Sequence, residues 1–249
     1  MLSLCRDCRT VIKSDAQDIS MDYSYARKII GLLQKRYGKH PHTRLRHRNM
    51  TELFVSVLLS PQCNDNQVNK VTKSLFCKYK TFNDYANADL AALQNTLNGL
   101  NYYKTKARHL KEASRMIIEK FHGRVPKTTR ELMELKGVGK KVANVILNEG
   151  YGIDEGIAVD THCGRVAIRL RLSRHKDPLK IEQDLLKSVP VEEWGRTSNL
   201  FIELGRDTCK ARNRECYRCV LRAICPSSLN TSTKQAGIYL RLQAKNNLK

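Results

Sequence analysis

Long apolar stretches are missing from this chain. Its 249 residues contain no run of about 18 apolar side chains, the length that a membrane-spanning helix needs. The first residues, MLSLCRDCR, also lack the apolar segment of a secretory signal peptide. The sequence therefore predicts neither a membrane span nor secretion, and we expect a cytoplasmic protein of prokaryotic type.

Acidic side chains are scarce relative to basic ones. Asp and Glu number 24 against 45 Lys and Arg, which gives a formal net charge of +21 and a sequence pI near 9.8. Binding of such a chain to a polyanion is favoured because the polyanion releases its counterions. Nucleic acid is the favoured partner, and the alternatives are a ribosome-associated basic factor and a protein of the membrane surface.

Strand patterns are missing as well. No convincing alternation of period two occurs, whereas apolar residues recur at helical spacing along most of the chain. Examples are Ala26, Ile29, Ile30 and Leu33; Val68, Val71 and Leu75; Ala107, Leu110, Ala113 and Ile117; and Ile181, Leu185 and Val189. We therefore predict an all-α protein without internal repeats, whose two ends are loosely attached.

The nine cysteines argue against a disulfide framework, because an odd number leaves one thiol unpaired and a chain of this length can bury a core without bridges. Four of them form the pattern Cys209-x6-Cys216-x2-Cys219-x5-Cys225. Such spacing predicts a metal centre. Zinc sites usually pair two short Cys-x2-4-Cys units, and here only the central pair is short, so a [4Fe-4S] cluster is favoured over zinc.

Two further groups of residues surround this prediction. Lys210, Arg212 and Arg214 lie in the first loop between the cysteines, where a loop held by a metal centre could present them to phosphates. Cys5 and Cys8 form another short pair, but two ligands are too few for a site, and we interpret them as ordinary free thiols.

A glycine hairpin between two helical patterns is predicted at residues 135–141, LKGVGKK. Gly137 and Gly139 can adopt positive φ, and the N–H groups that open the following helix carry partial positive charge. A DNA phosphate fits such a site, with Lys140 beside it. The alternative is a glycine-rich turn that only connects two packed helices.

Lys141 is expected in the first turn of the helix after this hairpin. Because Lys140 and the positive helix end both disfavour a second ammonium, we expect Lys141 to supply a neutral amine that can act as a nucleophile. A simple phosphate contact is the alternative role for such a lysine.

Asp160 follows the apolar residues Ile157, Ala158 and Val159 and precedes Thr161-His162. An aspartate at the start of a helix is commonly an N-cap, which is the structural alternative here. A buried approach would also hold the carboxylate rigidly, as catalysis requires.

Taken together, these segments resemble the endonuclease III family. LKGVGKK followed by VANVILNEG is similar to its helix-hairpin-helix, IAVDTH to its catalytic aspartate segment, and the cysteine spacing to its [4Fe-4S] loop. The segments LLSPQCNDNQVNK and GLNYYKTKA extend the similarity. The resemblance implies a two-lobed helix-hairpin-helix DNA glycosylase fold, with a six-helix barrel lobe at 44–156 and a cluster lobe formed by 1–43 and 157–249.

The resemblance also implies a monomeric base excision repair enzyme that removes oxidised pyrimidines from double-stranded DNA. Lys141 would displace the base and form a Schiff base, Asp160 would assist, and β-elimination would then cut the strand at the abasic site. Gln62 would enter the space left by the flipped nucleotide, Tyr102 would act as a second wedge, and His162 would lie near the DNA backbone.

Some residues depart from the family pattern. Lys136 replaces the proline that usually precedes the hairpin, and Asn101-Tyr102 replaces Gly-Leu, with Asn101 expected to tolerate left-handed geometry. The tyrosine resembles the adenine-specific relative, which has a glutamate at the position of Val57 and lacks the lysine. Alternative functions are therefore a monofunctional glycosylase of the adenine or thymine-mismatch type, and a non-enzymatic iron-sulfur DNA-binding protein.

Overall fold

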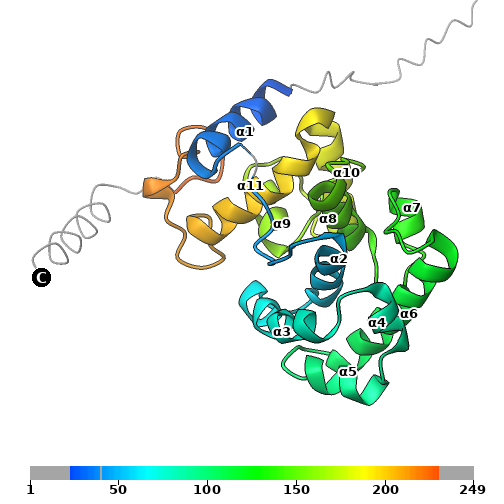
Figure 1. Ribbon diagram of the computed structural model, residues 1–249. Coiled ribbons are helices and arrows are strands. Elements are labelled where there is room, and N and C mark those ends of the chain that lie inside the picture. Colours follow the sequence, from blue (N-terminus) through cyan, green and yellow to red (C-terminus); the bar gives the residue numbers. More distant parts are fainter. Residues whose placement is uncertain (1–22, 40, 230–249) are drawn as a thin grey trace, which may run out of the picture.

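The computed structural model describes residues 23–39 and 41–229. Within these ranges the chain is all-helical and contains no strand, as the sequence predicted (Figure 1). The α-helices are α1 (Tyr23–Tyr37), α2 (Met50–Leu59), α3 (Asp65–Lys78), α4 (Phe82–Asn87), α5 (Leu90–Leu97), α6 (Tyr103–Phe121), α7 (Thr129–Leu132), α8 (Lys140–Tyr151), α9 (Thr161–Arg169), α10 (Pro178–Ser188) and α11 (Trp194–Asp207), and the 3-10 turns are η1 (Val191–Glu193) and η2 (Cys216–Arg218). Cys5, Cys8 and the two ends expected to be loose lie outside the described residues.

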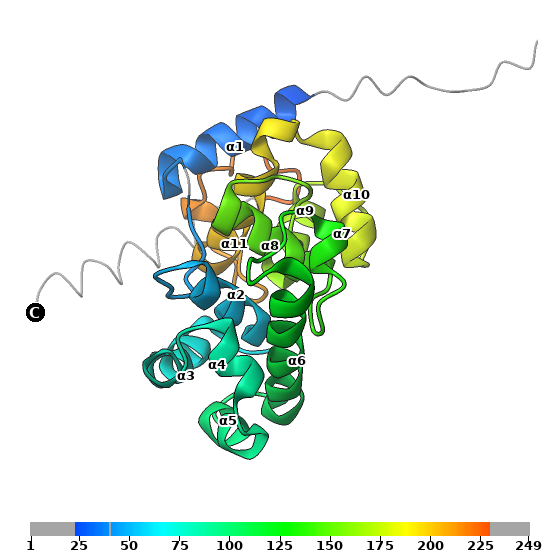
Figure 2. The same cartoon turned by 45° about the vertical axis from the view of Figure 1, so that its right-hand side comes forward.

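Apolar side chains collect in two buried clusters. The first contains residues from every helix between α2 and α8 and is centred on fully buried Phe54 and Tyr85. The rings of Phe54 and Phe82 pack edge to face, with their centroids 5.7 Å apart. The second joins α1, α9, α10 and α11 around Ile29 and Phe201. Figures 1 and 2 show α2 to α6 on one side of the molecule and α1 with α11 on the other. α1 is thus covered by helices from the far end of the chain.

The predicted helical stripes account for this packing. Ala26, Ile29, Ile30 and Leu33 are at most 2% exposed and form the face that α1 turns toward α11. The predicted lobe boundaries at 44 and 157 fall where the chain passes from one cluster to the other, and the division into domains stays a prediction.

The hairpin differs from its prediction in two details. The helix before it ends at Leu132, earlier than expected, because tight turns then bring Leu135 and Val138 into the core. Gly137 has a φ of 82°, as expected, but Gly139 has a φ of −96° and is the extended N-cap residue of α8. Only Gly137 therefore uses the left-handed freedom of glycine.

α8 connects the two clusters through polar contacts. On its first turns, buried Glu182 of α10 accepts a hydrogen bond from Asn144 (2.9 Å) and pairs with Lys140 (3.0 Å). Near its other end, Glu149 accepts bonds from Asn199 of α11 (2.7 Å) and from the Thr43 amide (2.9 Å). The helix that follows the hairpin is thus fixed to α10 and α11.

No helix in the described part of the chain is long and apolar enough to span a membrane.

We expect Gly156→Ala to destabilise the protein by disturbing this α8–α10 contact. A Cβ at residue 156 would lie 2.5 Å from Asn144 Nδ2 and 2.5 Å from Glu182 Oε1, so their hydrogen bond must break. Leaving a buried carboxylate without that donor should lower the free energy of unfolding by about 1–3 kcal/mol in urea denaturation.

Gly31→Ala in α1 is the matched control, because a Cβ there would meet no atom within 4 Å. Alanine is the better helix former, so this variant should keep or slightly raise the stability. Equal stability of the two variants would contradict the role given to the Asn144–Glu182 contact.

Candidate active site

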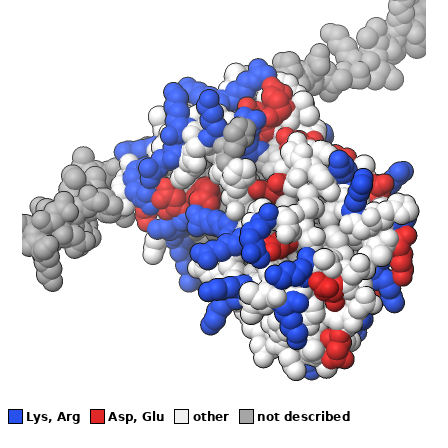
Figure 3. Space-filling view, viewed as in Figure 1, with Lys and Arg blue, Asp and Glu red and all other residues white. Residues whose placement is uncertain are grey.

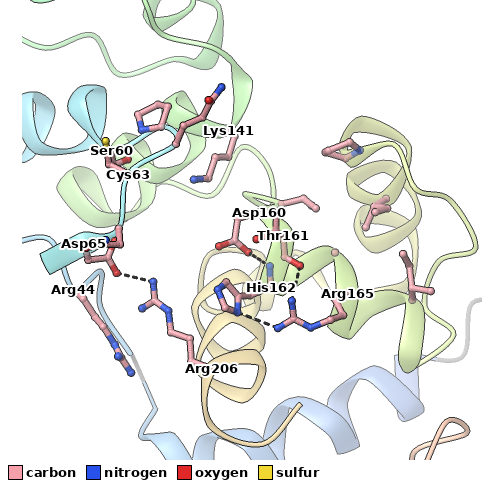
Figure 4. A pocket seen from close by; sticks show the side chains of 18 of the residues that line it. Arg44, Ser60, Cys63, Asp65, Lys141, Asp160, Thr161, His162, Arg165 and Arg206 are labelled. Carbon is pink, nitrogen blue, oxygen red and sulfur yellow. Dashed lines mark hydrogen bonds and ion pairs between the residues drawn. The ribbon is translucent and has the colours of Figure 1, made fainter. Parts of the chain in front are cut away.

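A cavity of about 1200 Å³ opens between the two clusters (Figure 4). Its wall is built from Arg44 before α2, the turn between α2 and α3, Lys141 in the first turn of α8, α9 along its length, the segment that opens α10, and Arg206 of α11. Of the site residues expected from the sequence, the structure brings together Gln62, Lys141, Asp160 and His162 in this wall.

Lys141 lies in the first turn of α8 with an exposed side chain, and in Figure 4 its amine points into the cavity toward Asp160. Among the described residues, the Lys141 amine has no ion-pair partner, whereas the neighbouring Lys140 is paired with Glu182 at 3.0 Å. That pairing offsets much of the charge of Lys140, so it repels a Lys141 ammonium less than the sequence suggested. It also turns Lys140 toward the protein.

Asp160 is the N-cap of α9, so the structural alternative considered for it is correct. Its Oδ1 accepts hydrogen bonds from the amides of His162 (2.8 Å) and Cys163 (2.7 Å). The preceding residues Ile157 to Val159 are buried, as predicted. Capping and catalysis are compatible here, because the cap uses one oxygen and fixes the orientation of the carboxylate at the cavity wall.

Cys163 lies behind this carboxylate and is fully buried. Burial raises the pKa of the Cys163 thiol, and the nearby Asp160 raises it further. The thiol therefore stays protonated and is a poor nucleophile.

The His162 ring is oriented by Arg165. The guanidinium lies 3.1 Å from His162 Nδ1 and also donates to the carbonyl groups of Gly205 and Cys209, both at 3.0 Å. Because a guanidinium can only donate, Nδ1 is the acceptor and Nε2 carries the ring hydrogen. His162 thus presents a donor of fixed orientation at the cavity.

Gln62 and Tyr102 both have left-handed backbone conformations, with φ of 58° and 56°. Tyr102 is 66% exposed. The left-handed geometry that Asn101 was expected to tolerate falls instead on Tyr102, the N-cap residue of α6. The side-chain amide of Asn101 donates to the Gln62 carbonyl (2.6 Å). Tyr102 does not line the cavity wall, but this bond joins its segment to Gln62.

Cations dominate the charged residues of the wall. Arg44, Lys141, Arg165, Arg169, Lys176 and Arg206 face only two carboxylates, Asp65 and Asp160. Figure 3 shows Lys and Arg gathered over the left and middle of the same face. Arg206 of α11 pairs with Asp65 of α3 at 2.6 Å and so ties the two clusters together beside the cavity.

These arginines could not be found from the sequence because they belong to no local motif. Arg165 and Arg169 lie on α9, whereas Arg44 precedes α2 and Arg206 lies on α11, so the three segments meet only in the folded chain. At the hairpin, a Cβ on exposed Gly139 would meet no protein atom within 4 Å, so the backbone that opens α8 is free to contact a ligand.

The four predicted metal-binding cysteines line one small pocket beside α9 and α11. All four are free thiols, and burial raises the pKa of Cys219 and Cys225. In the ranges that the structure describes, no three His, Cys, Asp or Glu side chains are close enough to hold a metal ion.

Two of the three basic residues expected to face phosphates are engaged by the protein itself. Lys210 pairs with Glu215 (2.5 Å), Arg214 donates to the Ser227 carbonyl (3.1 Å), and Arg212 is exposed. None of the three lines the cavity. Arg169 does so, and it also donates to the carbonyls of Cys209 (3.0 Å) and Lys210 (2.7 Å), which connects the cavity wall to the cysteine pocket.

Comparisons with known proteins agree with this geometry. A family model described as the HhH-GPD superfamily of base excision DNA repair proteins matches residues 55–191. Endonuclease III of Bacillus subtilis (strain 168) is 43% identical over 187 residues, which are 75% of this chain and 85% of the relative. Endonuclease III of Escherichia coli (strain K12) is 35% identical over 186 residues, 75% of this chain and 88% of the relative.

Solved structures give the same result. A trapped endonuclease III–DNA covalent intermediate has a TM-score of 0.77 and 40% identity, with 83% of this chain and 96% of that chain covered. A thermostable thymine-DNA glycosylase, 21% identical with a TM-score of 0.68 over 82% of this chain and 97% of its own, shares the fold. The chain therefore belongs to the endonuclease III family and is a DNA glycosylase with AP lyase activity that acts in base excision repair.

Proposed function

We propose that this protein removes oxidised pyrimidines from double-stranded DNA and cleaves the resulting abasic site through a Schiff base at Lys141. The observation that carries the proposal is the position of the Lys141 amine, which points toward the carboxylate of Asp160 in a cavity whose charged residues are mainly cations. The trapped covalent intermediate with DNA, formed by an endonuclease III that is 40% identical to this chain, supports a covalent mechanism.

In the proposed reaction, Lys141 Nζ forms a bond to C1′ of the damaged nucleotide while the bond between C1′ and the base breaks. The base leaves with the electron pair, and Asp160 takes up the lysine proton and stabilises positive charge on the sugar. Opening of the sugar gives an iminium. Loss of a C2′ proton then expels the 3′ phosphate, and water releases the lysine.

The cavity wall suits a flipped nucleotide and its flanking phosphates. The exposed backbone at Gly139 and the nearby cations can bind phosphate oxygens, and His162 Nε2 can donate to one. Gln62 and Tyr102 would occupy the gap in the duplex. Extrusion costs least for bases that already stack or pair poorly, which favours ring-saturated, oxidised pyrimidines as substrates. Lys140, Lys210, Arg212 and Arg214 would act as secondary phosphate contacts at the edges of the DNA.

A monofunctional glycosylase of the adenine or mismatch type has less support. Val57, the position at which the adenine-specific relative has a glutamate, is an apolar residue only 2% exposed. Such an enzyme would also need no lysine at position 141. A non-enzymatic DNA-binding protein would not need an amine and a carboxylate to share one cavity.

The four cysteines line one pocket, and their x6-x2-x5 spacing favours a [4Fe-4S] cluster over zinc. Cys209, Cys216, Cys219 and Cys225 would each supply one thiolate, and Arg169 already lies 3.2 Å from Cys209 Sγ, where it can stabilise negative charge on sulfur. When bound, the cluster would supply structural cross-linking of the loop. Because Arg169 joins this loop to the cavity wall, an ordered loop supports the active site.

We expect Lys141→Gln to abolish covalent trapping. On a duplex with thymine glycol or an abasic site, borohydride should convert the wild-type Schiff base into a stable adduct, and the variant should show none and lose about 10³-fold or more in cleavage rate. Asp160→Asn keeps an N-cap and should lose about 10²-fold or more in base removal.

Lys140→Gln is the matched control for Lys141→Gln, because the Lys140 side chain is held in an ion pair with Glu182. This variant should bind DNA more weakly but still form the adduct. An adduct of full yield in Lys141→Gln, or none in the wild type despite tight DNA binding, would refute the proposed chemistry.

We expect Cys216→Ser to lose the cluster. Wild-type protein purified without oxygen should contain about four iron and four sulfide per chain, the composition of this cluster type. It should also absorb light at about 400 nm. The variant should lose most of both and unfold at a lower temperature. Cys77→Ser, at an exposed thiol outside the pocket, should keep the iron content. One zinc per chain in the wild type would contradict the assignment.

A further inference from the structure

Lys106 has an unusual environment for a lysine. It is 7% exposed and lies in the first turn of α6, where the positive end of the helix disfavours a cation. Buried ammonium groups usually pair with a carboxylate. Among the described residues Lys106 has no carboxylate partner; instead its Nζ donates to the Pro61 carbonyl (2.8 Å) and contacts Cys63 Sγ (3.0 Å).

The Pro61 carbonyl lies just beyond the C-terminal end of α2, which ends at Leu59. The partial negative charge of that helix end compensates the ammonium of Lys106. Lys111, one turn further along α6, does the same for α4: its Nζ donates to the carbonyls of Ala86 and Ala88, both at 2.7 Å. Two lysines of α6 therefore bind the ends of two neighbouring helices, and only the first of these ends reaches the cavity.

Gln62 is the residue that these contacts surround. The carbonyl before it, that of Pro61, accepts from Lys106, and its own carbonyl accepts from Asn101 at 2.6 Å. One bond fixes the peptide plane before Cα of Gln62 and the other fixes the plane after it. Since φ and ψ describe the rotation of these two planes, the contacts together determine the left-handed conformation of Gln62, for which φ is 58°.

A left-handed conformation is unfavourable for a glutamine and persists only where the surrounding structure enforces it. Both donors belong to the segment that also carries Tyr102, which is left-handed as well and opens α6. In Figure 4 the turn from Ser60 to Cys63 lies at the edge of the cavity, opposite Asp160. The two exposed turns are thus joined into one unit before any ligand is present.

We propose that Lys106 and Asn101 are positioning residues that hold Gln62 in its left-handed conformation, so that Gln62 and Tyr102 enter the DNA duplex as one rigid two-pronged element. This inference rests on the proposed function. Without the two hydrogen bonds, Gln62 relaxes to the ordinary right-handed or extended conformation, and each insertion into DNA must restore the rarer one. Neither Lys106 nor Asn101 lines the cavity.

The test compares single-turnover base removal from a thymine glycol duplex by four proteins: wild type, Lys106→Met, Asn101→Ala and Lys111→Met. Methionine keeps the apolar stem of the lysine and removes the donor. Lys106→Met and Asn101→Ala should each slow base removal about tenfold, the factor that corresponds to about 1.4 kcal/mol. Lys111→Met removes an equivalent helix-end contact away from the cavity and should match the wild-type rate.

A second readout separates positioning from general weakening of the fold. When Gln62 is replaced by alanine, the conformation that Lys106 and Asn101 enforce no longer matters. Lys106→Met and Asn101→Ala should therefore have less than twofold effect in the Gln62→Ala background, a non-additive result expected for residues that act through one another. A purely structural role would slow that background as strongly as it slows the wild type.

A third readout follows DNA directly. With 2-aminopurine placed next to the lesion, insertion of the two-pronged element should raise the fluorescence of the unstacked base, and the rise should be slower in Lys106→Met and Asn101→Ala. Asn101 is exposed, so its variant folds even if Lys106→Met does not. Wild-type rates in Asn101→Ala, or equal losses with and without Gln62, would overturn the inference while leaving the glycosylase assignment intact. No base removal by the wild type would instead reject the proposed function itself.

Discussion

The position of α8 relative to α10 is the constraint on which the active site depends. Lys141 lies at the start of α8 and Asp160 caps α9, which packs against α10, so their separation depends on how α8 is held to α10. Buried Glu182 makes this connection through Asn144 and Lys140 on the first turns of α8. Because a buried carboxylate is unfavourable unless its oxygens are satisfied, the contact resists small shifts of the helix that carries Lys141.

The same constraint places the two lysines at the start of α8 in different environments. In sequence they are adjacent and equivalent, and either could contact a phosphate or act on a substrate. In the fold, Lys140 is drawn toward Glu182, while the Lys141 amine points into the cavity. A difference of one residue is about 100° around a helix, which is enough to place one amine in an ion pair and the other in the cavity.

Several residues of the cavity wall also stabilise the fold around it. Asp160 caps α9 with one oxygen and thereby aims its carboxylate at the cavity. Arg165 holds the ring of His162 while binding the carbonyl of Cys209. Arg169 lies in the cavity wall and at the cysteine pocket at once. The second buried cluster therefore does more than support the fold, since it also connects the cysteine loop to the cavity wall.

The sequence by itself determined the all-α class, the buried stripes and the hairpin, and it singled out Lys141, Asp160 and the four cysteines as candidate site residues, because these features depend on helical periodicity or on residues a few positions apart. Only the tertiary structure decided that Arg44, Arg165, Arg169 and Arg206 share one wall, that Lys140 pairs inward, and that Tyr102 rather than Asn101 is left-handed. Lys106 shows the reason most clearly: nothing near it in sequence indicates its role, because its partners lie 43 and 45 positions away, at the end of a different helix. Such contacts arise from packing between distant segments, and local patterns do not contain them.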